Sequence, residues 1–192
     1  MSAHHNHHHA AEERPLKGAF LLIAAYMCVE AVGGWVANSL TLLADAGHMF
    51  LDASSLGLAW YAVRLSHRRT DSNLSYGYHR FQVLAAFVNG LSLLALCAWI
   101  VIQAVGRLGT PEPMLAGPAL VIAALGLIVN LVAFLMLQES GATSINLRAA
   151  ALHVIGDIMG SIAAIAAAAI ALLTGWNYAD PILAFVIVAI LL

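Results

Sequence analysis

The chain has 192 residues, of which 62% are hydrophobic and only 9% are charged, and its mean hydropathy is +0.88. Soluble domains contain about 45–50% apolar and about 25% charged residues, so these values argue against a soluble enzyme and against a disordered chain. Eight Lys and Arg against ten Asp and Glu give a formal net charge of −2, which argues against nucleic-acid binding, and the composition indicates a polytopic membrane protein.

Long apolar stretches divide the chain. A helix crosses a bilayer in about 20 mostly apolar residues, and five stretches reach this length. A sixth stretch begins near Tyr178 and is still apolar at Leu192, so we expect a truncated last helix and a natural protein that continues. The sequence therefore predicts an all-α membrane protein with a six-helix transmembrane bundle. The expected helices are residues 16–37, 40–65, 81–108, 114–137, 149–173 and 178–192.

The segment before the first helix, residues 1–14, contains five histidines between His4 and His9. We expect it to be a mobile His-rich tail that binds Zn²⁺ weakly, followed by a transmembrane domain over residues 15–192. The interruption at Asn6 favours a natural metal-collecting segment over an engineered tag. A cleavable signal peptide is not expected, because the amino end has no suitable apolar run.

The basic residues predict the orientation. Cytoplasmic ends of membrane helices carry an excess of Lys and Arg. Only Arg107 falls on the side opposite the amino terminus. We therefore expect both termini in the cytoplasm and insertion into the bacterial plasma membrane. The basic residues on the expected cytoplasmic side are Arg14, Lys17, Arg64, Arg68, Arg69, Arg80 and Arg148.

Two predicted spans carry ionisable pairs far from their ends. His48 and Asp52 lie in the second span, and His153 and Asp157 lie in the fifth. An ionisable side chain near the centre of a membrane helix costs about 2.5–3.5 kcal/mol, so its presence indicates a function. A spacing of four places both members of a pair on one helical face. If the two faces meet, two imidazoles and two carboxylates form a tetrahedral set for Zn²⁺ or a similar ion.

Other polar residues in the spans admit two interpretations. Asp45 lies on the same helical face as His48, and it is either a carboxylate in a vestibule of the site or a solvated or capping residue. Glu30 and Asn130 are lone polar residues in their spans, and a hydrogen-bonded packing role is favoured over metal binding for both. Gly156 and Gly160 are interpreted as a small-residue face for close helix packing.

Four motifs resemble those of the cation diffusion facilitator family. Residues 38–52 (NSLTLLADAGHMFLD) are similar to its second-helix signature, and residues 146–157 (NLRAAALHVIGD) are similar to its fifth-helix signature. Residues 76–80 (YGYHR) and 179–182 (ADPI) resemble the starts of its third and sixth helices. The matches occur in the family's order and cover nearly all of residues 16–192.

The resemblance implies a secondary active transporter rather than an enzyme. Members of the family export divalent metal in exchange for protons, commonly as homodimers, with no cofactor besides the transported ion. It implies that His48, Asp52, His153 and Asp157 form the central transport site. Histidine in both pairs resembles the zinc-type branch, and Cd²⁺, Co²⁺ and Fe²⁺ remain alternatives to Zn²⁺. We expect this sequence to lack the cytoplasmic metal-binding domain that follows the sixth helix in the family.

A second metal site in the loop after the second helix is a weaker expectation. Asp71 is present there, but Leu74 and Tyr78 stand where some relatives have histidines. His79 offers a partial second site, or else belongs to an interfacial structural motif. Two other functions are alternatives for the whole chain. An intramembrane metalloenzyme lacks an accompanying general base, and a metal-dependent sensor or scaffold is to be separated from a transporter by measured flux.

Overall fold

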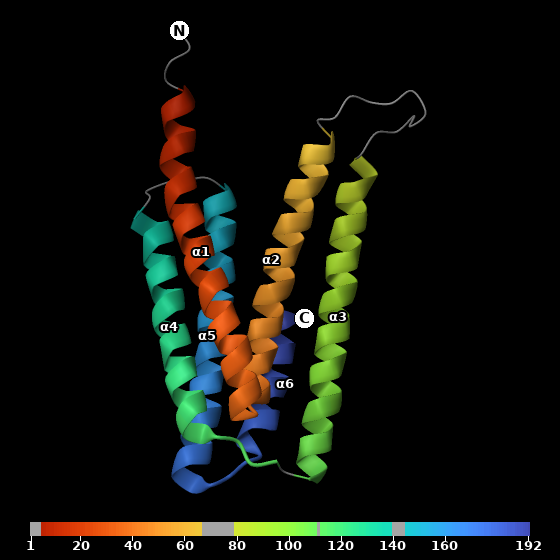
Figure 1. The fold of residues 1–192 in the computed structure, drawn as a ribbon, viewed down its shortest axis with the longest axis vertical. Coiled ribbons are helices and arrows are strands. Elements are labelled where there is room, and N and C mark those ends of the chain that lie inside the picture. Colours follow the sequence, from red (N-terminus) through yellow and green to blue (C-terminus); the bar gives the residue numbers. More distant parts are fainter. Residues whose placement is uncertain (1–4, 67–78, 111, 140–144) are drawn as a thin grey trace.

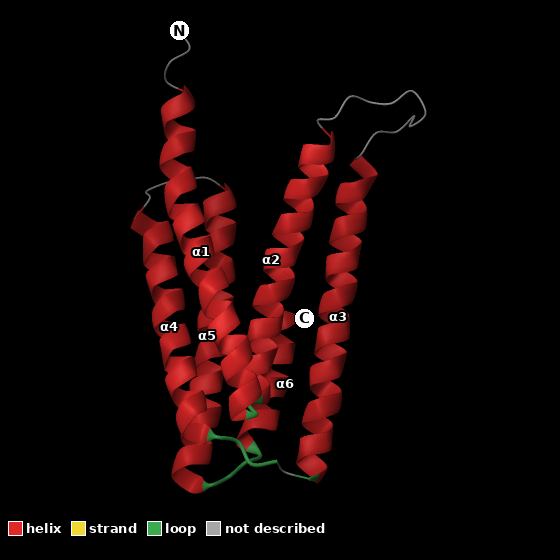
Figure 2. Cartoon of the chain, viewed as in Figure 1, coloured by secondary structure: helices red, strands yellow, loops and turns green. Residues whose placement is uncertain are grey.

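The computed structural model describes the backbone of residues 5–66, 79–110, 112–139 and 145–192, and the side chains of residues 18–54, 84, 86–110, 112–138 and 151–192. Within these ranges every regular element is a helix (Figure 2). This confirms the predicted all-α class. The helices are α1 (His5–Ala37), α2 (Leu40–Ser66), α3 (His79–Gly109), α4 (Ala116–Glu139), α5 (Ile145–Thr174) and α6 (Ala179–Leu191).

The helices run alternately up and down, so α1, α3 and α5 begin and α2 and α4 end toward one end of the bundle, whereas the short α6 ends about midway along it (Figure 1). The short connections after α1, α3 and α5 lie at the other end. α4 packs against α1 and α5, while α2 contacts α1, α3, α5 and α6. Four described helices contain stretches long and apolar enough to cross a membrane: Gly18–Ala37, Ala86–Gly109, Ala116–Gln138 and Ala151–Thr174.

One boundary differs clearly from the prediction. α1 begins at His5, so the segment expected to be a mobile tail belongs largely to a helix. Residues 10–13 are Ala-Ala-Glu-Glu, all strong helix formers, which favours extension of the apolar helix toward the amino end.

Close packing of small residues holds the centre together. α5 buries several alanines, and three of them, Ala164, Ala168 and Ala171, lie in one cluster with residues of α1, α2 and α4, where Leu42 and Ala123 are also fully enclosed. Small side chains allow membrane helices to approach closely, which suits a bundle whose outer surface is apolar. Large apolar side chains such as Trp35 and Leu173 point outward, as expected for a lipid-facing surface. The buried alanines of α5 are Ala163, Ala164, Ala167, Ala168 and Ala171.

The turn between α1 and α2 fixes where α2 begins. Asn38 has a positive φ of 53°, a conformation that Asn tolerates better than most residues and that terminates α1. The Ser39 hydroxyl accepts a hydrogen bond from the Leu42 N–H at 3.4 Å, as an N-terminal cap does. α2 therefore starts at a defined residue, and His48 lies a little over two turns further along.

Candidate metal centre

The two His-x-x-x-Asp pairs face each other across α2 and α5. The Asp52 Oδ2 atom lies 3.2 Å from His48 Nε2 on its own helix and 3.3 Å from His153 Nε2 on α5. His153 Nε2 is also 3.8 Å from Asp157 Oδ2. The imidazole rings of His48 and His153 are 5.5 Å apart between centroids and inclined by 62°. The four residues predicted to meet thus lie in one region.

Three of the four form the tightest group. His48, His153 and Asp157 each offer one ligand atom, and these three atoms all lie within 4.8 Å of one another. Asp52 is outside this group, although its carboxylate contacts both imidazoles. The contact between Asp52 and the two imidazoles is the arrangement expected of a carboxylate that orients histidine ligands or joins them.

Several polar atoms at this centre have no hydrogen-bond partner among the described residues. The side chain of Asp157 is fully buried, and neither of its carboxyl oxygens has a hydrogen bond among the described residues. His48 Nδ1 is likewise buried without a hydrogen-bond partner there. Buried polar atoms are normally hydrogen-bonded, so this exception needs a ligand or a function. Imidazole nitrogens and carboxylate oxygens aimed at one point suit a borderline divalent cation such as Zn²⁺.

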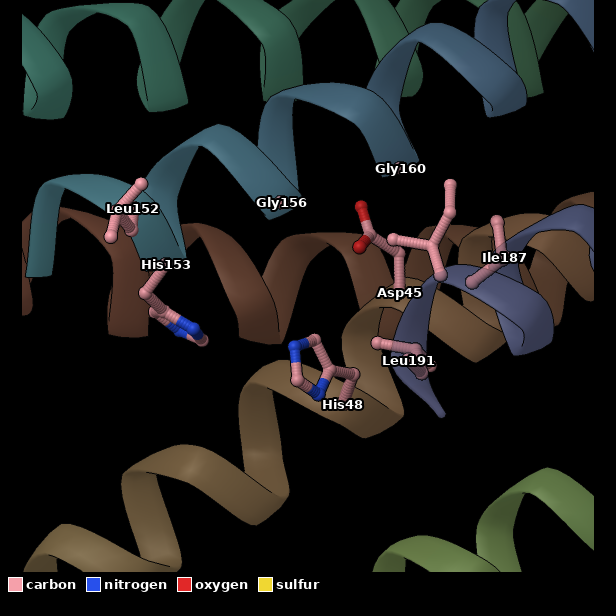
Figure 3. Close-up of a pocket in the computed structure, with 9 residues that line it drawn as sticks. Asp45, His48, Leu152, His153, Gly156, Gly160, Ile187 and Leu191 are labelled. Carbon is pink, nitrogen blue, oxygen red and sulfur yellow. The ribbon is translucent and has the colours of Figure 1, made fainter. Parts of the chain in front are cut away.

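A cavity of about 150 Å³ connects the site with Asp45. His48 and His153 approach each other across it, while Asp45 lies deeper along α2 with its carboxyl group toward α5 (Figure 3). Asp45 is 3% exposed and lies inside α2, so the solvated or capping interpretation is wrong, and its place on the cavity wall fits the vestibule alternative. A Cβ atom on Gly160 would lie 2.5 Å from Asp45 Oδ1, so this glycine makes room for the carboxyl group.

The other wall of the cavity is apolar. Leu152 and Gly156 of α5 and Ile187, Ile190 and Leu191 of α6 complete it. A Cβ atom on Gly156 would meet nothing within 4 Å. Gly156 therefore borders open space, whereas Gly160 serves the close packing that the sequence indicated.

The two residues expected to form a second metal site are not among the described side chains. Asp71 lies in residues 67–78, which are outside the described residues, and the side chain of His79 is outside them as well. The histidines of residues 4–9 also lack described side chains. The expectations of a second metal site and of a metal-collecting segment stay predictions.

Sequence reasoning missed the role of Asp180, which organises the opposite end of the bundle. Its carboxylate accepts hydrogen bonds from the backbone N–H groups of Leu40 (2.7 Å) and Thr41 (3.1 Å) and from the hydroxyls of Ser39 and Thr41, both at 2.8 Å. Arg107 Nη1 lies 3.4 Å from the same carboxylate. Asp180 of α6 therefore caps the start of α2 from outside that helix. In the sequence, Asp180 stood out only as part of the ADPI motif, which did not indicate this role.

Glu30 is the other residue whose role the sequence did not indicate. It is fully buried in α1, and neither carboxyl oxygen has a hydrogen-bond partner among the described residues. Asn130, which the sequence grouped with Glu30, does have the expected packing role, because its amide donates to Ser161 Oγ at 3.2 Å across α4 and α5.

Comparison with known proteins gives matches over nearly the whole chain. The family described as the cation efflux transmembrane domain matches residues 16–192. The zinc transporter ZitB of Pectobacterium atrosepticum is 44% identical over 193 residues, covering 100% of this chain and 60% of that protein. A cadmium, cobalt and zinc/H(+)-K(+) antiporter of Bacillus subtilis is 42% identical, covering 97% of this chain and 60% of that protein.

A more distant relative agrees with these two. The metal cation efflux system protein CzcD of Cupriavidus metallidurans is 38% identical, covering 97% of this chain and 60% of that protein. The chain thus spans about 60% of the length of these curated relatives.

Proposed function

Because this chain belongs to the cation efflux family, as its resemblance to the cation diffusion facilitators predicted, we propose that it is the transmembrane part of a proton-coupled exporter of divalent metal, with Zn²⁺ as the main cargo. The family is one of transporters and not of enzymes. The observation that carries the proposal is the meeting of His48, His153 and Asp157 on facing helices inside an apolar bundle.

The proposed transport site consists of His48, Asp52, His153 and Asp157. The 3.2 Å and 3.3 Å contacts of Asp52 with the two imidazoles support its inclusion, because a small shift of its carboxylate would bring an oxygen to the ion as its fourth ligand. Two nitrogens and two oxygens complete a tetrahedron, the geometry that Zn²⁺ prefers. The two carboxylates neutralise the dication, which makes a charged cargo tolerable inside the membrane.

Competition between metal and protons supplies the coupling. Imidazole binds metal only in its neutral form, so protons and Zn²⁺ compete for His48 and His153. In the proposed cycle Zn²⁺ binds from the cytoplasm, the helices switch access, and protons from the other side displace the metal. Inward movement of protons then drives outward movement of metal.

The proposed orientation places both termini in the cytoplasm of a bacterial cell, with the protein in the plasma membrane. It rests on the alternation of the helices (Figure 1) and on the basic residues, because Arg107 lies in the last turn of α3, whereas the Lys and Arg residues of α1, α2 and α5 lie at or toward the end of the bundle where α1 begins. In this orientation the hydrogen bonds of Asp180 close the outer end of the bundle. We also propose that the full-length protein acts as a homodimer, as its family resemblance implies.

The choice of Zn²⁺ follows from the ligands. Imidazole nitrogen favours borderline ions such as Zn²⁺ and Co²⁺ over harder ions that prefer all-oxygen sites. The printed names of the relatives include zinc, cadmium and cobalt, which supports the same group of ions for this chain. Fe²⁺ is a further alternative cargo, and its competition with Zn²⁺ for transport should be measured together with that of Cd²⁺ and Co²⁺.

The test uses the full-length protein reconstituted in sealed vesicles with an imposed pH gradient. We expect proton-driven Zn²⁺ transport, and we expect Asp157→Ala to reduce it to the level of empty vesicles. Glu112→Ala is the control, since the side chain of Glu112 is 58% exposed at the other end of the bundle and should leave transport unchanged. Transport by Asp157→Ala at the unmutated rate would refute the central site. Metal binding without any vectorial flux would instead favour the sensor or scaffold.

A further inference from the structure

Three buried carboxyl groups lie beside one another in the centre of the bundle, and only one belongs to the proposed metal site. Gly34 of α1 packs against Leu42 of α2, and Glu30 and Asp45 lie about one turn farther along these two antiparallel helices, away from the turn that joins them (Figure 1). The two carboxyl groups interact electrostatically with each other and with Asp157 of α5. Glu30 is 0% exposed, Asp45 3% and Asp157 1%. The pair formed by Glu30 and Asp45, called the carboxyl pair below, is not part of the ligand set.

No cation neutralises the carboxyl pair. Among the described side chains Arg107 is the single Lys or Arg, and it contacts Asn38, Glu112 and Asp180 at the outer end. α4 packs against α1 but carries no titratable residue between positions 116 and 138. An ionised carboxylate in an apolar interior is strongly unfavourable without a partner, and two neighbouring ionised carboxylates cost still more free energy because they repel each other.

No neutral donor satisfies the carboxyl pair either. Both oxygens of Glu30 and the Oδ2 atom of Asp45 lack a hydrogen-bond donor among the described residues. The Tyr26 hydroxyl interacts with Glu30, but its one hydrogen is donated to the Ile122 carbonyl oxygen at 2.7 Å. The two carboxyl groups can satisfy each other only if one of them carries a hydrogen, because a bond between two carboxyl groups requires a donor.

The carboxyl pair also has a route to the metal site. Asp45 lines the same cavity of about 150 Å³ as His48 and His153, and Gly160 leaves the space that its carboxyl group fills (Figure 3). Asp180, the described carboxylate of α6, is occupied by its hydrogen bonds at the start of α2. The groups that can exchange a proton with the carboxyl pair through the cavity are therefore the two imidazoles and water.

We propose that Glu30 and Asp45 form a proton-binding site separate from the metal ligands, which holds one proton when the metal site is empty and releases it when a divalent cation binds nearby. The inference rests on the proposed function. The positive charge of the cation favours the ionised form of the neighbouring pair. The proton leaves through the cavity past Asp45 to water, so that a dication enters and a proton departs.

The test measures Zn²⁺ affinity of the purified full-length protein against pH. The slope of log affinity against pH gives the number of protons released per ion bound. For Glu30→Gln we expect Zn²⁺ to bind with the same stoichiometry, and we expect that number to fall by about one. Asp45→Asn should have the same effect, and the exposed Glu112→Gln should leave the number unchanged.

A second measurement does not depend on the variants. Infrared spectroscopy of the unmutated protein should show a protonated carboxyl group in the absence of metal, and the signal should disappear when Zn²⁺ binds. An unchanged proton number in both Glu30→Gln and Asp45→Asn would overturn the proposal. Loss of one bound Zn²⁺ per chain in these variants would also overturn it, because the pair would then be a metal site.

The two proposals fail separately. Both measurements require metal binding but no transport, so absence of flux in vesicles would refute the proposed function and leave the proton site standing. Proton-driven transport by the unmutated protein, together with an unchanged proton number in Glu30→Gln and Asp45→Asn, would support the proposed function and refute the proton site.

Discussion

Replacement of Asp180 by alanine tests whether one carboxylate holds together the end of the bundle where α2 and α6 begin. The side chain joins α6 to the first turn of α2 through four hydrogen bonds, and it approaches Arg107 of α3. Asp180→Ala removes the acceptor and leaves two N–H groups, two hydroxyls and part of a guanidinium without their partner. All of these donors are buried or partly buried.

The expected effect is large. A hydrogen bond to a charged group contributes about 1.5–3 kcal/mol, but bonds that share one acceptor are not additive. Removal of one member of a buried charged pair costs about 3–5 kcal/mol. We therefore predict that Asp180→Ala lowers the free energy of unfolding by about 3–5 kcal/mol. Asp180→Asn keeps one acceptor oxygen but places an amide hydrogen toward a donor, so about 2 kcal/mol is expected.

The assay is reversible unfolding of the full-length protein in lipid bicelles. Glu112→Ala is the matched control, because Glu112 also approaches Arg107, at 3.7 Å, but is 58% exposed. Exposed ion pairs contribute less than about 1 kcal/mol, so this variant should be nearly as stable as the unmutated protein. The reasoning is refuted if Asp180→Ala loses no more stability than Glu112→Ala.

Three further predictions concern the centre of the bundle. His153→Asp should weaken the preference for Zn²⁺ over Mn²⁺, because a carboxylate oxygen replaces a nitrogen ligand; competition for transport measures this, and an unchanged ranking of the ions contradicts it. Gly160→Ala should lower stability by about 1–3 kcal/mol and impair transport, since its Cβ would lie 2.5 Å from Asp45 Oδ1, whereas Gly156→Ala, with nothing within 4 Å, should be tolerated. Zn²⁺ affinity should fall as the pH is lowered from about 7.5 to about 5.5, because imidazole must be neutral to bind metal; calorimetry at several pH values would contradict this by showing constant affinity.

The features that the sequence predicted well are local ones. Apolar runs mark the membrane helices, and α2 was predicted over residues 40–65 and extends over Leu40–Ser66. The spacing of four in each His-x-x-x-Asp pair places its members on one face whatever the rest of the chain does. The sequence also predicts that two such faces meet, because ionisable groups buried in separate spans are stabilised by pairing with one another.

The features that it missed depend on partners far away in the chain. The Asp180 carboxylate accepts a hydrogen bond from the N–H group of Leu40, which lies 140 residues away in the chain. No sequence pattern relates residues so far apart. Glu30 was interpreted like Asn130, since each is one polar residue in an apolar run. Only the three-dimensional packing separates them: Asn130 finds the Ser161 hydroxyl across α4 and α5, whereas Glu30 finds another carboxyl group.

The same contrast separates two kinds of buried carboxyl group in one bundle. Asp180 is surrounded by donors, which satisfy a carboxylate in its ionised form. Glu30 has no hydrogen-bond donor within the described part of the chain and lies beside Asp45, so the two carboxyl groups are stabilised when one of them holds a proton. Asp180→Asn should therefore mainly lower the free energy of unfolding. In Glu30→Gln the amide mimics the neutral acid, so this variant should keep the fold and change the number of protons released when metal binds.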